Sequence, residues 1–182
     1  MPQNLKPYSM IVDFVTGREQ PNIGAEENRQ AFERFLVNSK GYSKNDIEVD
    51  ANIDLCILGE TYRSQVDLVV SSDAGQTRFM AVKCAAGSLD SRIREILAAA
   101  RLLDTVQIPL AVVSDGRTAI VLDAVSGKKI GTGLDAIPSK EEARIRLQST
   151  EHVPLPAERR ERESLIFRAY DSDNVNVIRK MT

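Results

Sequence analysis

The spacing of hydrophobic and polar positions changes along the chain, and each change predicts a different element. Between residues 25 and 39, Phe32, Phe35 and Leu36 recur at helical spacing, and Gly41 follows. This pattern predicts an amphipathic helix that ends at the glycine. Three strand-like runs come next, at residues 47–58, 61–71 and 77–85. The turns between them are short and rich in Gly and Asp, which favours an antiparallel meander.

A second helix and a further strand complete the predicted core. Apolar residues such as Ile93, Ile96 and Ala100 lie at helical spacing before Asp104, and a short apolar strand follows at residues 108–113. A strand, a helix and a strand in succession favour a right-handed crossover with parallel pairing. Residues 118–123 then predict a hairpin partner for the last strand. The order of elements indicates an α/β fold with an αβββαβ core, in which helices flank a central mixed sheet.

The predicted core occupies the middle of the chain. Residues 1–22 are interrupted by Pro and Gly and predict an irregular N-terminal arm, and residues 23–137 form the α/β core. Residues 138–182 predict a C-terminal helical appendage, packed on the core or extending from it. Within this appendage we expect helices at residues 139–148 and 157–170 and an edge strand at residues 175–178.

Composition narrows the class of protein without naming a function. The chain has 182 residues, of which 42% are hydrophobic and 27% charged, which is typical of a globular domain. Cys56 and Cys84 both lie in apolar runs, as reduced thiols of a cytoplasmic protein do. No apolar run approaches the roughly 20 residues of a membrane span, and the N-terminus lacks the pattern of a secretory signal. We therefore expect a cytoplasmic protein with no membrane partner.

The charge balance excludes some functions and leaves others open. The chain has 24 Lys and Arg residues against 26 Asp and Glu residues, a formal net charge of −2. A protein that coats nucleic acid non-specifically is usually strongly basic, so this role is disfavoured, whereas a local basic cleft remains compatible with the balance. A single histidine and two cysteines argue against a catalytic triad and against a closed zinc site.

Two charged residues stand inside otherwise apolar strand runs. Asp67 lies in the second predicted strand and Lys83 in the third. If Asp73 pairs with Thr77 across the intervening turn, the same register places Asp67 opposite Lys83. Side chains alternate along a strand, so a defined set of residues then shares one face of the sheet. The residues on that face are Arg63, Gln65, Asp67, Ala81 and Lys83.

A buried acid opposite a buried amine has two interpretations. Burying a charge is costly unless the charge is paired or bound to a metal, so the two residues could form a structural ion pair between strands. The functional interpretation is metal-dependent phosphodiester cleavage. In that chemistry a carboxylate holds Mg²⁺ and a lysine stabilises the developing charge, and at least one further oxygen ligand is needed.

The order of elements, with Asp on the second strand and Lys on the third, resembles the PD-(D/E)XK nuclease superfamily. More narrowly, residues 24–127 resemble the N-terminal nuclease domain of type I restriction enzyme R subunits. The resemblance implies a Mg²⁺- or Mn²⁺-dependent deoxyribonuclease, with DNA as a partner and with other restriction-modification or ATPase subunits as candidate partners. The matching stretches are Glu26-Glu27-Asn28-Arg29-Gln30-Ala31-Phe32, Lys40-Gly41-Tyr42, Arg63-Ser64-Gln65-Val66-Asp67, Ala81-Val82-Lys83 and Val112 to Gly116.

The resemblance also implies roles for individual residues. Asp67 corresponds to the metal-binding aspartate and Lys83 to the catalytic lysine, while Glu27 matches the first-helix acid that approaches the metal. The family pattern has an acid two residues before the lysine, and here that position is Ala81, whose methyl group cannot bind magnesium. This departure leaves the source of the second metal ligand open.

In some relatives the helix after the lysine strand supplies the missing acid, and Glu95 and Asp90 are the candidates here. We take Glu95 as the catalytic and metal-binding acid, although helical spacing puts it nearly opposite the apolar stripe, where a solvated position is usual. Asp90 is placed to cap the helix. The arginines that we expect to contact DNA phosphates are Arg63, Arg92 and Arg94.

Three hypotheses follow from the sequence. The first is a metal-dependent DNA endonuclease domain. The second is a module of the same fold that has lost its metal and serves DNA binding or protein assembly, which Ala81 favours. The third is a small-molecule-binding α/β protein unrelated to nucleic acid.

Overall fold

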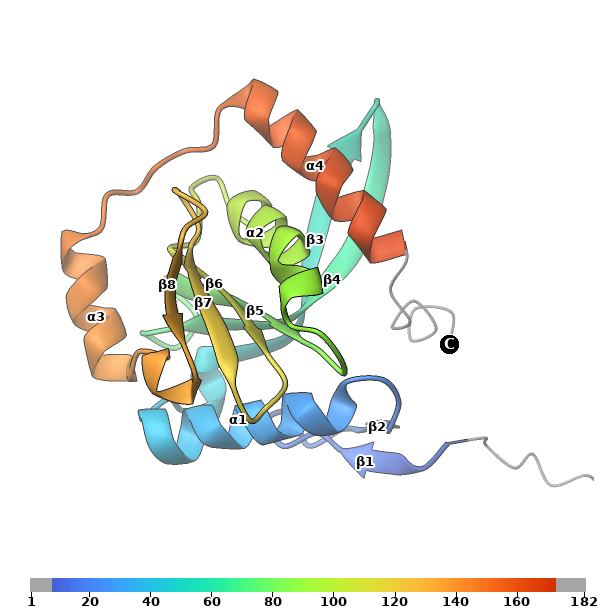
Figure 1. The fold of residues 1–182 in the computed structure, drawn as a ribbon, viewed down its shortest axis with the longest axis vertical. Helices are drawn as coiled ribbons and strands as arrows, with labels where there is room; N and C mark the ends of the chain where they lie inside the picture. The colour runs from blue at the N-terminus through green and yellow to red at the C-terminus, as the bar shows by residue number, and fades with distance from the viewer. Residues whose placement is uncertain (1–7, 173–182) are drawn as a thin grey trace, which may run out of the picture.

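The computed structural model describes residues 8–172, and a six-stranded mixed sheet forms its centre (Figure 1). The strands lie in the order β3-β4-β5-β6-β7-β8. β5 and β6 are parallel, and the other neighbouring strands are antiparallel. The predicted α/β fold and the predicted parallel pairing after the crossover are therefore confirmed. The strands are β3 (Ile47–Ile57), β4 (Glu60–Ser71), β5 (Arg78–Cys84), β6 (Leu110–Ser114), β7 (Ala119–Asp123) and β8 (Lys129–Thr132).

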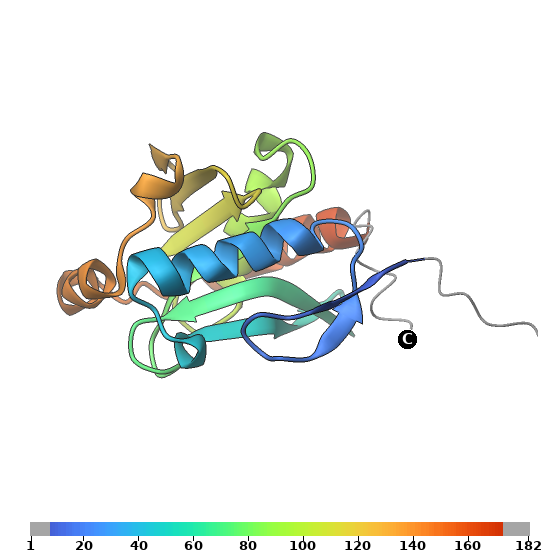
Figure 2. The same cartoon turned by 90° about the horizontal axis from the view of Figure 1, so that it is seen from below.

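Helices cover both faces of this sheet (Figures 1 and 2). On one face α1 (Glu26–Lys40) packs through its apolar stripe, with α3 (Lys140–Ser149) beside the same core. On the other face lie α2 (Ile93–Leu102) and α4 (Ala157–Ser172). This layering agrees with the restriction-endonuclease-like core that the resemblance implies. Three short 3₁₀ helices connect these elements: η1 (Lys44–Asp46), η2 (Asp90–Arg92) and η3 (Leu134–Ala136).

Side-chain alternation in the central strands divides the core in two. Leu68, Val70 and Val82 belong to the core under α1, whereas Val69 and Ala81 belong to the core under α2. Each strand therefore presents alternate residues to opposite helices, as the period of two predicts. Ala81 and Lys83, two positions apart on β5, therefore lie on the same face of the sheet, the face under α2.

The structure differs from the prediction at two places, the N-terminal arm and β8. Residues 1–22 were expected to be irregular, but β1 (Met10–Val12) and β2 (Glu19–Pro21) pair as a short hairpin. The Asp13 carboxylate organises the connection by accepting hydrogen bonds from the backbone amides of Val15 and Thr16, at 3.1 and 2.7 Å. β8 was not predicted because its four residues are largely exposed and lack an apolar alternation. The edge strand expected at residues 175–178 lies outside the described residues.

The C-terminal helices are present where the sequence predicts them, and α4 packs closely on α2. Phe167 of α4 is 2% exposed and belongs to the core under α2. Arg101 of α2 forms a buried ion pair of 2.8 Å with Glu163 of α4. No helix among residues 8–172 is long and apolar enough to cross a membrane.

Candidate functional site

The register between β4 and β5 brings together the acid and the amine singled out in the sequence. Leu68 pairs with Val82 and Val69 with Ala81, so the next position places Asp67 across from Lys83. The ammonium nitrogen of Lys83 lies 3.6 Å from Oδ1 of Asp67. The second oxygen of Asp67, Oδ2, accepts a hydrogen bond of 2.7 Å from the backbone amide of Cys84. The Asp67 carboxylate is thus fixed from the neighbouring strand through both of its oxygens.

Glu95 joins this pair from the helix. Its Oε1 lies 3.1 Å from the ammonium of Lys83, and its Oε2 lies 3.4 Å from the guanidinium of Arg92. Helical spacing favoured a solvated position for Glu95, but the residue is 3% exposed. The difference arises because Glu95, in the first turn of α2, faces the sheet and contacts Lys83 of β5.

The acid–lysine site, defined here as Asp67, Lys83 and Glu95, is buried and close to electroneutral. The side chains are 9%, 6% and 4% exposed, respectively. With Arg92 at its rim, two carboxylates face two cations. Burial alone would lower the pKa of Lys83, but the negative charges of Asp67 and Glu95 outweigh this effect and raise it above its ordinary value. Lys83 is therefore a cation at neutral pH.

The structure does not bring Glu27 to the acid–lysine site. Its carboxylate is exposed and accepts a hydrogen bond of 2.8 Å from the side-chain amide of Asn22. The preceding residue, Glu26, points inward and lies 3.0 Å from Arg29. Residues three apart share a face of a helix, whereas adjacent residues are turned by about 100°, so Glu26 and Glu27 cannot both face the core. Asp90 is exposed in η2, before α2 begins.

The three arginines expected to contact DNA lie at different places. Arg92, whose side chain is 29% exposed, borders the acid–lysine site at the end of η2, and Arg94 is exposed on the first turn of α2. The Arg63 side chain is 81% exposed on β4, 3.4 Å from Asp54. Arg92 and Arg94 are therefore close to the site along the chain, while Arg63 is four residues from Asp67 along its strand.

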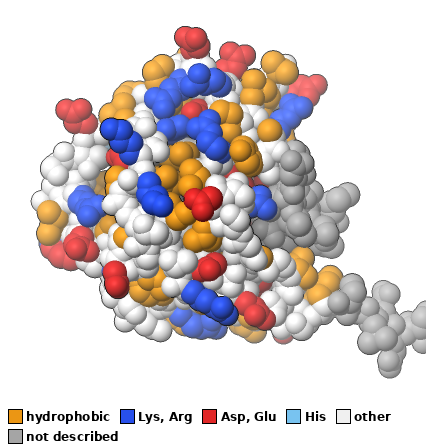
Figure 3. All heavy atoms as spheres, in the orientation of Figure 1, with side chains coloured by type: hydrophobic (Ala, Val, Ile, Leu, Met, Phe, Trp, Pro, Cys, Tyr) orange, Lys and Arg blue, Asp and Glu red, His pale blue; other side chains and the backbone are white. Residues whose placement is uncertain are grey.

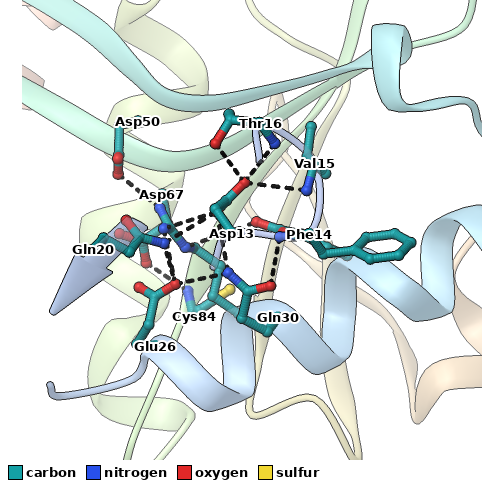
Figure 4. Close-up of polar contacts among 12 residues, drawn as sticks. Asp13, Phe14, Val15, Thr16, Gln20, Glu26, Gln30, Asp50, Asp67 and Cys84 are labelled. Atoms are coloured by element: carbon teal, nitrogen blue, oxygen red, sulfur yellow. Dashed lines mark hydrogen bonds and ion pairs between the residues drawn. The ribbon is translucent and has the colours of Figure 1, made fainter. Parts of the chain in front are cut away.

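A second buried polar group lies beside α1 and was not predicted as a unit. We call it the Arg29 cluster: Arg29 with Asp13, Glu26, Glu33 and Asp50. The guanidinium lies 2.8 Å from Asp50, 3.0 Å from Glu26 and 3.2 Å from Asp13, and 3.8 Å from Glu33. Figure 4 draws most of this group with Gln20 and Gln30, which bond to the same carboxylates, and with Asp67 and Cys84 on the central strands. The signal in the sequence was the sharing of one helix face by Glu26, Arg29 and Gln30.

The Arg29 cluster carries more acids than bases. Four carboxylates surround one guanidinium, and Glu33 has no hydrogen bond of standard geometry at either oxygen. Burial and the charge of Asp13 raise the pKa of Glu33 to about 8, although Arg29 acts in the opposite direction. Asp50 has a φ of +52°. It lies on β3 between the pairs Val49–Leu68 and Ala51–Val66, and therefore across from Asp67 of β4. The cluster therefore adjoins the strand position that carries the acid–lysine site.

The donor set of the acid–lysine site fits magnesium chemically. Mg²⁺ prefers oxygen ligands and is commonly held by one or two carboxylates, with water and substrate phosphate completing its shell. Asp67 and Glu95 supply two such carboxylates at one point, where both contact the ammonium of Lys83. Ala81, fully buried beside Val69 and Ala111, supplies none. Among residues 8–172, no three His, Cys, Asp or Glu side chains are grouped as a metal site.

The fold and the site define an α/β module of the restriction-enzyme type, with a mixed sheet and a buried acid–lysine group. Comparison with protein families agrees, since the model for the type I restriction enzyme R protein N terminus matches residues 24–138. This match covers more than half of the chain, and the chain belongs to that family. Searches of curated proteins and of solved structures give no significant match.

Proposed function

We propose that this chain is a metal-dependent DNA endonuclease domain of the PD-(D/E)XK type, with Asp67, Lys83 and Glu95 as its catalytic residues. The observation that carries the proposal is the position of Glu95, whose carboxylate lies 3.1 Å from the Lys83 ammonium. It supplies from α2 the acid that Ala81 does not supply from β5. Family membership supports a restriction-enzyme context and DNA as the substrate.

Each residue of the site has a role that follows from its surroundings. Asp67 and Glu95 would hold Mg²⁺, which when bound polarises a phosphate and lowers the pKa of a coordinated water. The Cys84 amide fixes the orientation of Asp67, and Arg92 holds the second oxygen of Glu95. The Lys83 ammonium, charged at neutral pH, is placed to stabilise negative charge that develops on the scissile phosphate.

The surface around α2 offers cations to a DNA backbone. Arg94 is exposed on the first turn of α2, which carries Glu95, and Arg92 is partly exposed at the end of η2 just before it. Figure 3 shows further Lys and Arg side chains gathered over α4, which packs on α2, with acidic side chains among them. We assign the phosphate contacts nearest the site to Arg92 and Arg94, because phosphate contacts orient a nucleic acid without reading its sequence. Other restriction-modification or ATPase subunits are the partners that the family membership supports.

Cleavage of a supercoiled plasmid tests this proposal. In Mg²⁺ or Mn²⁺ the wild type is expected to nick the plasmid, and Asp67→Asn and Glu95→Gln are expected to reduce the rate about 100-fold or more. Asp90→Asn serves as the matched control, because Asp90 is an exposed acid just before the same helix, and it should retain the wild-type rate. Thermal unfolding confirms that each variant is folded. Equal cleavage by all four proteins would indicate a contaminant and contradict the proposal.

A second function is favoured by a separate observation. The Lys83 ammonium lies between Asp67 and Glu95, and the charges of the site and Arg92 balance, as in a structural ion-pair group. With Ala81 in place of an acid, the same fold could serve as a DNA-binding or assembly module without cleavage. Retention of DNA at low salt by a wild type that never cuts the plasmid would establish this alternative.

A further inference from the structure

A polar cavity lies where the two parallel strands end. It has a volume of about 270 Å³ and is lined by Asn28, Ala86, Gly87, Asp115 and Arg117. The loop after β5 supplies one wall, the turn after β6 another, and α1 the third. Crevices at the carboxyl ends of parallel strands are common ligand sites in α/β proteins. None of these five residues belongs to the acid–lysine site.

The walls of this cavity are held in fixed positions. The side-chain amide of Asn28 donates a hydrogen bond of 2.7 Å to the backbone carbonyl of Ala85, which ties α1 to the end of β5. Gly116 has a φ of +82° and packs so closely on α1 that an added Cβ would lie 2.8 Å from the carbonyl oxygen of Asn28. The Asp115 carboxylate accepts hydrogen bonds of 2.9 Å from the backbone amides of Arg117 and Thr118. A site built this way loses little entropy when a ligand binds.

Several donors of the lining residues have no partner among residues 8–172. The backbone amides of the exposed residues Ala86 and Gly87 donate no hydrogen bond to any described residue, and the Arg117 guanidinium makes no hydrogen bond or salt bridge to one. Asn28 retains a second amide hydrogen. Hydrogen bonds from the turn and the charge of Arg117 lower the pKa of Asp115 despite its partial burial, so this carboxylate is charged, and one of its oxygens is engaged by the turn. Exposed amides beside an arginine are the donor set that binds phosphate.

We propose that this cavity binds a backbone phosphate of DNA through Arg117 and the amides of Ala86 and Gly87. The identity of the ligand as DNA rests on the proposed function. Ala86 follows Lys83 by three positions, a backbone span of at most about 10 Å. A DNA strand rises about 3.4 Å per nucleotide, so the bound phosphate lies within roughly three nucleotides of the bond at Lys83. Arg117 would then set the position of the strand at the acid–lysine site.

The test is a titration of ¹⁵N-labelled protein with a short DNA duplex in EDTA, so that no cleavage occurs. The amide resonances of Ala86 and Gly87 are expected to shift on binding. Arg117→Gln should weaken duplex binding about 5- to 10-fold at low salt and reduce the slope of log K against log salt by about 1. Arg144→Gln, which removes an exposed arginine on α3, should bind as the wild type does. Unshifted Ala86 and Gly87 amides at saturating duplex, or equal binding by the two variants, would overturn the proposal.

Three further outcomes separate this inference from related ones. If inorganic phosphate shifts the same amides at lower concentration than the duplex does, the cavity is a free-phosphate site and the assignment to DNA fails. If the wild type never cuts the plasmid but Arg117→Gln weakens duplex binding, the phosphate site is supported and the nuclease proposal is wrong. If the wild type cuts the plasmid and Arg117→Gln binds and cuts equally well, the nuclease proposal is supported and the phosphate site is wrong.

Discussion

Replacing Lys83 by methionine removes the cation that lies between two buried carboxylates, while keeping a long side chain in the same space. At 3.1 and 3.6 Å, the contacts with Glu95 and Asp67 are each worth about 5 kcal/mol at an effective dielectric constant near 20. Desolvation offsets several kcal/mol for each ion, so the net value of the group is smaller than this sum. Removing one partner of a buried ion pair leaves an uncompensated charge, and we expect a loss of about 3–5 kcal/mol of unfolding free energy.

Urea denaturation at pH 7.5, followed by circular dichroism, measures this loss. Arg78→Met is the matched control, because Arg78 lies on the same strand and also contacts two carboxylates, at 2.8 and 3.0 Å. Its partners Glu48 and Asp104 are 47% and 37% exposed, so water screens the contacts and we expect a loss of about 1 kcal/mol or less. Equal losses in the two variants would show that burial of the acid–lysine site has no energetic consequence, and would refute the reasoning.

Three further predictions concern stability. Because the pKa of Glu33 is raised from 4.5 to about 8, the folded protein keeps a proton that the unfolded chain releases, and the unfolding free energy of the wild type should fall by up to about 1.4 kcal/mol per pH unit between pH 5 and 8. In urea titrations Glu33→Gln should remove this slope, and parallel curves for the two proteins would contradict the prediction. Phe167→Ala should lower the unfolding free energy by about 3–5 kcal/mol, and Leu165→Ala, at an exposed position, by less than about 1 kcal/mol. Similar losses in the two variants would mean that α4 adds nothing to the core. Gly116→Ala should lower the melting temperature more than Gly59→Ala does. Both glycines have a φ of +82°, but only at Gly116 would the added Cβ meet α1. The reverse order of the two melting temperatures would contradict the close packing of Gly116 on α1.

Much of the central sheet could be predicted because its signals are local. The turn between β4 and β5 is short, so counting residues across it was enough to place Asp67 opposite Lys83. Alternation along the strands then assigned Leu68 and Val82 to one face and Ala81 to the other. These inferences needed no knowledge of distant parts of the chain.

The remaining features depend on contacts between distant residues. Glu95 is buried because it faces the sheet and contacts Lys83 of β5, and no pattern within α2 reveals that contact. The inward-facing Glu26 contacts Arg29, and Asp13, from the loop between β1 and β2, contacts the same guanidinium.

Calorimetric titration with Mn²⁺ tests most directly whether Glu95 supplies the carboxylate that Ala81 lacks. The wild type is expected to bind one ion with a submillimolar dissociation constant, and Glu95→Gln to bind it at least about tenfold more weakly. A wild type that takes up no Mn²⁺ at millimolar concentration, or a variant that binds it as tightly, would contradict a metal-dependent site at Asp67 and Glu95.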